Sequence, residues 1–176
     1  MTARSSRRRR VLAGGGLTLA AAGLVLAAGG GQRSLAGPPQ FLPLTGQWCL
    51  AGGGPCLELE VPEAEEQYFW GLQKRPRLPP LRGMWFRFSP PSQARFWMHL
   101  TPEPLDMVFV RGGRVVAIET ALPCPRLPCR SYGPFEPVDG VVELAAGEAA
   151  RLGIRVGSEA QPRRLPAVAP AAPARD

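Results

Sequence analysis

The sequence is poor in histidine, which narrows the kinds of site that it can build. Among 176 residues there is one histidine, His99, together with four cysteines. A zinc site takes three or four protein ligands, most often from His and Cys side chains. A single histidine supplies too few of them, so we expect no metal ion and no cofactor.

The predicted domain has no excess of positive charge, although the chain as a whole is basic. The formal charge is +7, but residues 1–36 contain six arginines and no acidic residue. Residues 37–176 therefore hold 15 basic and 14 acidic side chains. A nucleic-acid surface needs Lys and Arg clustered on one face, and no such stripe occurs downstream. We expect no nucleic-acid partner.

The chain also lacks the alternation of strands and helices that builds a parallel sheet, so we expect no parallel sheet. A phosphate-binding loop is excluded for a related reason. Such a loop follows a strand and opens a helix, whereas the glycine triplets here lie in the N-terminal apolar segment and in a predicted hairpin turn.

Short segments with apolar residues at every second position fill residues 43–157. Turns rich in Gly and Pro separate them, and two stretches, 62–75 and 146–153, have helical patterns instead. The expected fold is all-β, or mainly β with two short helices, in a compact sandwich or barrel. Residues 37–42 are expected to form a linker, and residues 158–176 a Pro/Ala-rich disordered tail.

The first 36 residues have the layout of a signal peptide. A basic stretch, "RSSRRRR", precedes an apolar run from Val11 to Ala28 and then small residues, which place cleavage between Ala36 and Gly37. The arginine pair before the apolar run is similar to a twin-arginine signal. The alternative is an uncleaved membrane anchor, the chain's one expected contact with a membrane. Either way we expect an exported domain, in the periplasm or the extracellular space.

Four cysteines in an exported chain predict two local disulfides. Cys49 and Cys56 flank a Gly-rich turn, and Cys124 and Cys129 flank a Pro-rich loop. The local pairing is the simplest of three connectivities. A metal site or a redox dithiol is the alternative, but redox pairs prefer two intervening residues, and the second pair has four.

The one histidine lies in "FWMHLTPEPLDMVF", seven residues before Asp106. A catalytic set would need a nucleophile beside His99. Thr101 is the nearby hydroxyl, but Pro102 is expected to end its strand, so we assign no catalytic residue. Asp106 is better explained as a carboxylate that accepts backbone N–H bonds and fixes the "TPEP" loop. The alternative is a binding pocket. Its candidate residues are Arg95, Trp97, His99, Asp106 and Tyr132.

The order of motifs resembles the domain of unknown function 192 family. The resemblance lies in "GLQKRPRLPPLRGMWFRF", "FWMHLTPEPLDMVFV", "GRVVAIE", "PCPRLPCRSYG" and "VVELAAGEAARLGIRVG", which together cover roughly residues 56–157. Gly153 and Gly157 of the closing segment match as well. The resemblance implies a mainly β, jelly-roll-like domain that is often exported in bacteria, and it implies no established activity.

The chain departs from this family's pattern at its histidine. The usual pattern has Lys-Asn after "FWM", and here His99 and Leu100 occupy those positions. The following Pro104, Leu105 and Asp106 match. A family role that required lysine chemistry would therefore not carry over to His99.

Without a complete catalytic set, we expect an exported monomeric β domain that binds a small ligand or another envelope protein without turnover. The alternative is a small hydrolase-like or carbohydrate-active enzyme that uses Asp106. Paired carboxylates would have to converge in space for that chemistry, and sequence spacing does not show such convergence.

The cysteine pairing predicts the outcome of a thiol titration. Under denaturing conditions the exported protein should show no reactive thiol without reductant and four with it, the full number of its cysteines. Four free thiols in the exported, unreduced protein would contradict the disulfide interpretation.

Overall fold

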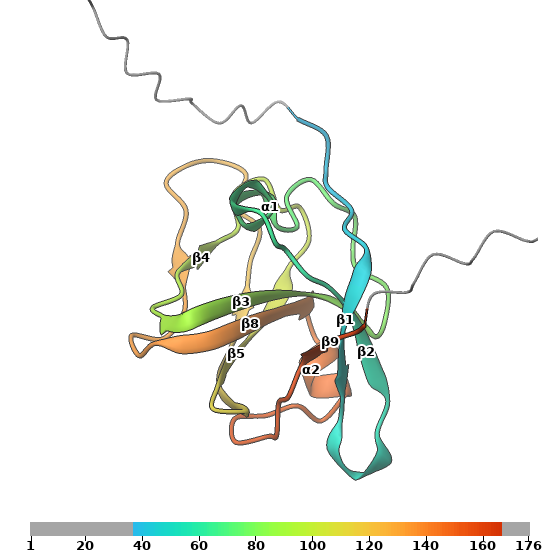
Figure 1. Cartoon of the computed structure of the whole chain (residues 1–176). Helices are drawn as coiled ribbons and strands as arrows, with labels where there is room; N and C mark the ends of the chain where they lie inside the picture. The colour runs from blue at the N-terminus through green and yellow to red at the C-terminus, as the bar shows by residue number, and fades with distance from the viewer. Residues whose placement is uncertain (1–36, 167–176) are drawn as a thin grey trace, which may run out of the picture. The chain divides into compact units, whose positions relative to one another are not determined.

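A computed structural model describes residues 37–166, and the signal peptide expected over residues 1–36 lies outside this range. Within it the chain forms nine strands and two short α-helices (Figure 1). The strands are β1 (Leu44–Cys49), β2 (Cys56–Glu60), β3 (Arg82–Ser92), β4 (Phe96–Trp97), β5 (Leu105–Arg111), β6 (Arg114–Ala121), β7 (Ser131–Tyr132), β8 (Val138–Ala145) and β9 (Arg163–Arg164). The helices are α1 (Glu65–Trp70) and α2 (Glu148–Arg151), and η1 (Ala51–Gly53) is a 3₁₀ turn.

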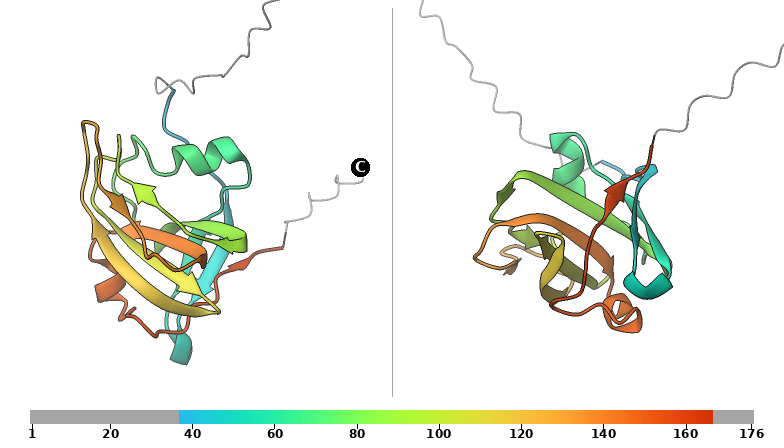
Figure 2. Two further views of the ribbon diagram at one scale, coloured as in Figure 1. Left: turned by 90° about the vertical axis from the view of Figure 1, so that its left-hand side faces the viewer. Right: turned by 60° about the horizontal axis from the view of Figure 1, so that its bottom comes forward.

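Seven strands form one curved sheet in the order β6-β5-β8-β3-β2-β1-β9, and β4 and β7 form a separate two-stranded sheet (Figure 2). The larger sheet does not close into a barrel, and the arrangement is sandwich-like. The prediction of a mainly β sandwich or barrel with two short helices is confirmed, and the structure selects the sandwich.

Strands β3, β8 and β5 form the centre of the sheet, where β8, β5 and residues 83–86 of β3 are buried on both faces. The register aligns Met84 of β3 with Glu143 of β8, and Glu143 with Met107 of β5. The next row consists of Trp85, Val142 and Val108. Because side chains alternate between the faces of a sheet, the two rows point in opposite directions. Each face therefore needs its own cover.

Two cores provide that cover, and α1 and α2 lie on opposite sides of the central strands (Figures 1 and 2). The α1-side core includes Leu72, Met84, Phe86, Met98, Leu105, Met107, Phe109, Tyr132, Val138 and Val141. The α2-side core includes Trp48, Leu57, Leu59, Val108, Val110, Val115, Val142, Leu144, Ala149 and Ile154. Each core buries one of the two alternating sets of side chains from the central strands.

The β1–β2 hairpin forms as its sequence predicts. Cys49 and Cys56 are opposite each other in the register and are joined by a disulfide across the Gly-rich turn. Leu57 and Leu59 alternate on one face of β2 and are fully buried. The expected local pairing of the first two cysteines is confirmed.

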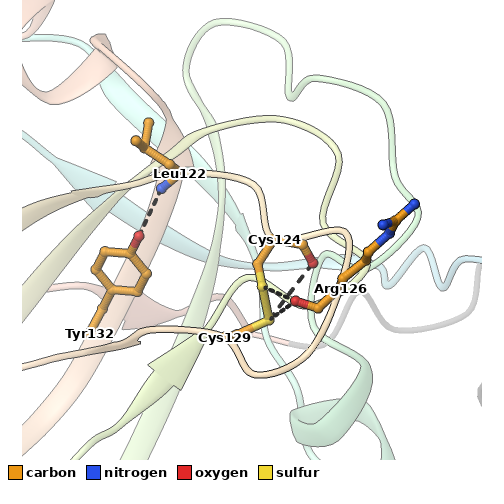
Figure 3. Close-up of a disulfide and its surroundings, with 5 residues drawn as sticks. All are labelled: Leu122, Cys124, Arg126, Cys129 and Tyr132. Carbon is orange, nitrogen blue, oxygen red and sulfur yellow. Dashed lines mark hydrogen bonds between the residues drawn. A yellow bond between two sulfur atoms is a disulfide. The ribbon is translucent and has the colours of Figure 1, made fainter.

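The second disulfide, Cys124–Cys129, is also confirmed and closes the Pro-rich loop between β6 and β7 (Figure 3). Beside this loop, the Tyr132 hydroxyl accepts a hydrogen bond of 3.1 Å from the backbone N–H of Leu122 (Figure 3). The bond joins Leu122, at the start of the loop, to Tyr132 of β7, which follows the end of the loop. The loop is therefore fixed at its base as well as by its disulfide.

One pair of strands in the sheet is parallel. β2 and β3 pair side by side in the same direction, and the chain between them passes through α1. The expectation of no parallel pairing is therefore wrong for this one pair, and the connecting helix α1 has six residues. It ends where Gly71 adopts a positive φ of 45°, a conformation that favours glycine.

Residues 95–100, where apolar side chains occur at every second position, form a strand only at β4. After it, the Met98 carbonyl accepts hydrogen bonds from the N–H groups of Thr101 (3.1 Å) and Cys124 (3.2 Å). These bonds bend the chain into a turn. His99 therefore forms only an isolated bridge with Cys124 and does not extend the strand.

The C-terminal part of the domain differs from expectation. Residues 154–158, whose alternation predicted a last strand, form turns, and residues 158–166 pack on the sheet. β9 pairs with β1, and the N–H of the buried Ala160 donates to the Gly113 carbonyl at 2.8 Å. The predicted disordered tail is therefore wrong for its first nine residues. Residues 167–176 lie outside the described range.

Residues 37–42 are part of the domain and not a linker. The Gln40 side chain donates a 2.8 Å hydrogen bond to the Gln67 carbonyl of α1. The N–H of Leu42 donates a 2.7 Å bond to the Glu60 carboxylate. The composition of the segment did not indicate these contacts, because their partners, a backbone carbonyl and a carboxylate, lie on distant segments.

Two features of the fold bear on where the protein works. Two disulfides are typical of proteins in an oxidising compartment and are rare in the cytosol. Among residues 37–166, no helix is long and apolar enough to cross a membrane.

The packing of residues 158–166 can be tested at Ala160, which is 1 % exposed. Ala160→Asp should lower the free energy of unfolding by about 2–4 kcal/mol, because it buries a carboxylate without a partner. Val156→Asp is the matched control, since Val156 is 63 % exposed. Equal stabilities of the two variants in urea denaturation would show that Ala160 is not buried.

Candidate functional site

The five residues expected to form a pocket do not gather at one place. Asp106 lies on β5 between Leu105 and Met107, whose side chains belong to the α1-side core. Because side chains alternate along a strand, Asp106 faces the opposite side of the sheet, where α2 lies. The other four residues lie in or beside the two-stranded sheet. They are Arg95, Trp97, His99 and Tyr132.

Asp106 has its acceptor positions occupied by groups of the fold. One carboxylate oxygen accepts the N–H groups of Gly147 (2.8 Å) and Ala149 (3.1 Å), and the other accepts the Thr120 hydroxyl at 2.9 Å. The side chain therefore anchors the start of α2, and not the "TPEP" loop that the sequence suggested. None of its hydrogen-bond partners is titratable, so no acid–base pair forms around it.

The four residues around the two-stranded sheet contact one another only in part. The Arg95 guanidinium donates to the Gly133 carbonyl at 2.5 Å. The Trp97 ring, which is 42 % exposed, lies 5.6 Å from the His99 ring between centroids. His99 is itself buried, and its Nδ1 has no hydrogen-bond partner among the described residues.

Above the α1-side core, α1, β3 and β4 form a groove with a volume of about 330 Å³, which we call the aromatic groove. Its lining residues are Tyr68, Phe69, Phe86, Phe88, Gln93, Ala94, Arg95, Phe96 and Trp97. The rings hold one another edge to face, with Phe86 and Phe96 centroids 5.0 Å apart and Tyr68 and Phe86 centroids 5.9 Å apart. Of the predicted pocket residues, Arg95 and Trp97 lie here.

A smaller cavity of about 40 Å³ adjoins the groove and shares five of its lining residues, Tyr68, Phe69, Phe86, Phe96 and Trp97. We call it the inner cavity. Its other lining residues are Trp70, Gly71, Leu72, Gln73, Thr101 and Glu143. The inner cavity therefore brings three polar side chains together with the aromatic rings.

Glu143 is a carboxyl group buried in the middle of the sheet. It lies on β8 between Met84 and Met107, is 4 % exposed, and has no hydrogen-bond or ion-pair partner among the described residues. Burial raises the pKa of Glu143 from 4.5 to about 8, because water no longer stabilises the charged form. At neutral pH the side chain is mostly protonated and can donate as well as accept a hydrogen bond.

The other two polar groups of the inner cavity are also incompletely bonded. The Gln73 amide donates to the Phe69 carbonyl at 2.8 Å, but its buried Oε1 has no partner among the described residues. The buried Thr101 uses its N–H in the turn at Met98, and its hydroxyl has no partner within residues 37–166. Buried polar groups are nearly always hydrogen-bonded in folded proteins, so three such groups in one cavity make it the candidate site of this domain.

Few features of the sequence indicate this site. Glu143 interrupts the apolar run "VVELAA", and an acid within a strand buried on both faces is the one local signal. Thr101 was considered only as a hydroxyl close to His99 in the sequence, and no sequence pattern distinguishes Gln73 from a surface residue. The site depends on the pairing of β8 with β3 and β5, which brings together residues up to 70 positions apart in the chain.

Metal chemistry has no obvious place in the described structure. Residues 37–166 contain no group of three or more His, Cys, Asp or Glu side chains that could hold a metal ion. The inner cavity offers one carboxyl group, one amide oxygen and one hydroxyl, all of which accept hydrogen bonds. This set suits a ligand that donates hydrogen bonds.

The fold and this cavity define a small, disulfide-bonded, sandwich-like β domain. The model of the DUF192 family, described as "Uncharacterized ACR", matches residues 49–161. The chain therefore belongs to the DUF192 family, which confirms the resemblance seen in its motifs. No curated protein shows a match to the chain.

Two solved structures are similar to this chain. One is a protein of unknown function from Novosphingobium aromaticivorans, with 30 % identity and a TM-score of 0.59 over 75 % of this chain and 99 % of that one. The other is from Sinorhizobium meliloti and is described as a "putative transcription regulator". It has 29 % identity and a TM-score of 0.59 over 71 % of this chain and 98 % of that one.

The structural role of Asp106 predicts a specific loss of stability. Asp106→Ala should lower the free energy of unfolding by about 1–3 kcal/mol, because two backbone N–H groups and the Thr120 hydroxyl lose their acceptor. Asp139→Ala is the control, since the partly exposed Asp139 accepts a single bond from the Gly112 N–H and should matter less. An unchanged denaturation midpoint for Asp106→Ala would contradict this role.

The raised pKa of Glu143 predicts how stability changes with pH. The folded protein holds the Glu143 proton more tightly than the unfolded chain, so between about pH 5 and pH 8 this group lowers the free energy of unfolding by up to about 1.4 kcal/mol per pH unit. Glu143→Gln should remove this loss and be more stable than the wild type at alkaline pH. The exposed Glu136 provides the control: Glu136→Gln should follow the wild-type curve. Parallel curves for Glu143→Gln and the wild type, from urea denaturation at each pH, would mean that Glu143 titrates normally.

Proposed function

We propose that this protein is an exported, disulfide-bonded module of the cell envelope that binds a small ligand without turnover. The observation that carries the proposal is the inner cavity, where the Gln73 amide oxygen and the Glu143 carboxyl are buried without hydrogen-bond partners among the described residues. The adjoining aromatic groove supplies apolar contact area of the kind that small-molecule sites use.

The N-terminal sequence and the disulfides support export. Residues 1–36 have the basic stretch, apolar run and small residues of a signal peptide, and both disulfides need an oxidising compartment. Periplasmic or extracellular location follows as part of the proposal, with or without cleavage between Ala36 and Gly37.

Binding without turnover fits the distribution of the polar residues better than catalysis does. The alternative of a hydrolase-like or carbohydrate-active enzyme required Asp106 to act with a second titratable group. Within residues 37–166 the Asp106 carboxylate accepts its hydrogen bonds instead from backbone N–H groups and a threonine hydroxyl. Asp106 also faces away from the aromatic groove, so it can neither catalyse a reaction nor bind a ligand in that groove.

The description of the Sinorhizobium relative raises gene regulation as a possibility for this chain. Residues 37–176 carry nearly balanced charge, and DNA binding draws most of its affinity from Lys and Arg that neutralise phosphates. The cavity therefore favours a small ligand as the partner. We predict in addition that the protein is a monomer and that it binds no nucleic acid.

A ligand screen by thermal shift tests this function. The panel contains small aromatic and aliphatic compounds with alcohol, amide, carboxylate or amine groups, together with mono- and disaccharides. At least one class should raise the melting temperature of the wild type, and Trp97→Ala should lose that shift because Trp97 lines the groove. Phe41→Ala is the control, since Phe41 is an exposed aromatic outside the groove. A shift that survives Trp97→Ala, or no shift with any class, would refute binding in the groove.

A further inference from the structure

The inner cavity has the size and the polar groups of a site for one small cationic group. Its volume of about 40 Å³ compares with roughly 30 Å³ for a water molecule in the liquid, so it holds a single polar group and not a whole ligand. The Gln73 amide oxygen is buried there without a partner among the described residues, and the buried Thr101 and Glu143 line the same cavity with side chains that make no hydrogen bond within residues 37–166. A primary ammonium group has three N–H donors, one for each of these acceptors.

The walls of the cavity add a second attraction for a cation. Five aromatic residues shared with the groove line it, and Trp70 is a sixth. The faces of aromatic rings carry negative partial charge and attract ammonium groups, more strongly when water is excluded. An alcohol would offer one donor to three oxygen atoms. A carboxylate ligand could accept from the O–H groups of Glu143 and Thr101, but it would leave the Gln73 amide oxygen, which can only accept, without a donor.

We propose that the inner cavity binds the primary ammonium group of a small ligand, and that the apolar part of the same ligand lies in the aromatic groove. This assignment rests on the proposed ligand-binding function and names the chemical class of its ligand. The groove, at about 330 Å³, is large enough for a phenyl ring or a short alkyl chain.

Binding of an ammonium group changes the protonation of the site. Without ligand the buried Glu143 retains its proton, and an ammonium group favours the carboxylate. The Glu143 O–H bond breaks, its proton leaves to solvent, and the electron pair stays on the carboxylate that now faces the ligand's N–H groups. Close to one proton is released per ligand at neutral pH, and the ligand keeps its own charge.

Other charged groups near the cavity do not compete for this role. The titratable residues on the surrounding segments are Tyr68 on α1, Lys74 and Arg75 after it, and Arg95 and His99 on either side of β4. Tyr68 and Arg95 each donate to a backbone carbonyl, and Arg75 forms a buried ion pair with Glu60. The Lys74 ammonium donates to the Gly37 carbonyl and lies over the Trp70 ring, 5.2 Å from its centroid, so the other five rings remain for a ligand. The His99 ring packs beside Trp97. β3 and β5 present Met84 and Met107 to Glu143. Burial is the one cause that raises the pKa of Glu143, so no neighbouring cation neutralises it.

Isothermal titration calorimetry of the purified full chain with phenethylamine and phenethyl alcohol tests the proposal. The two probes have the same apolar part and differ in the group that enters the cavity. At about pH 8 the amine should bind at least about tenfold more tightly than the alcohol, and its affinity should rise by up to about tenfold per pH unit between roughly pH 6 and 8. Titrations in buffers of different ionisation enthalpy should show close to one proton released at neutral pH.

Variants separate the role of Glu143 from that of the groove. Glu143→Gln should weaken amine binding at least about tenfold, abolish proton release and leave alcohol binding unchanged. Thr101→Val should weaken amine binding and keep the proton release, because it removes an acceptor that does not titrate. Glu136→Gln, the same substitution on an exposed carboxylate, should behave as the wild type. Circular dichroism of each variant establishes that it is folded.

The possible failures are distinguishable. Equal binding of amine and alcohol, or amine binding without proton release, would overturn the ammonium site and leave the groove as a binding site. Absence of binding by both probes to the folded wild type would overturn the ammonium site and count against the groove as well. Unchanged amine binding by folded Glu143→Gln would show that Glu143 does not contact the ligand.

Discussion

Burial of the three central strands on both faces is the constraint on which the rest of the structure depends. β3, β8 and β5 direct apolar side chains to two opposite sides, and each side requires a cover. The available covers are small: a six-residue helix and two short strands on one side, and a four-residue helix with the curled end of the sheet on the other. Such short elements are not stable alone, so polar bonds and disulfides hold them in place.

Two acids on the central strands show how their surroundings decide what a carboxyl group does. Asp106 and Glu143 occupy neighbouring rows on β5 and β8 and point to opposite faces. At Asp106 the sheet meets the start of a helix, whose free N–H groups satisfy the carboxylate. At Glu143 the neighbours are methionines and aromatic rings, which supply no donor. The first residue therefore stabilises the fold, and the second is free to bind a ligand.

Much of the fold could be predicted from the sequence, because the signals for it are local. Alternating apolar residues indicate strands, and cysteines separated by short loops indicate the two disulfides. The structural use of Asp106 was expected, but its partners at Gly147 and Ala149 lie some 40 residues away. Residues 158–166 were missed because Pro/Ala-rich composition does not reveal backbone bonds to a sheet edge. Glu143 was missed because its burial depends on two neighbouring strands.

The unpartnered groups around the inner cavity also bear on how this fold balances stability against activity. A buried amide or carboxyl without a hydrogen bond typically costs a protein about 1–3 kcal/mol, a sizeable part of the stability of a small domain. A leucine or methionine at position 143 would complete the surrounding core and give a sturdier protein. The presence of Gln73, Thr101 and Glu143 around this buried cavity therefore lowers the stability of the fold. Such a trade is characteristic of positions that selection keeps for what they do and not for how well they pack.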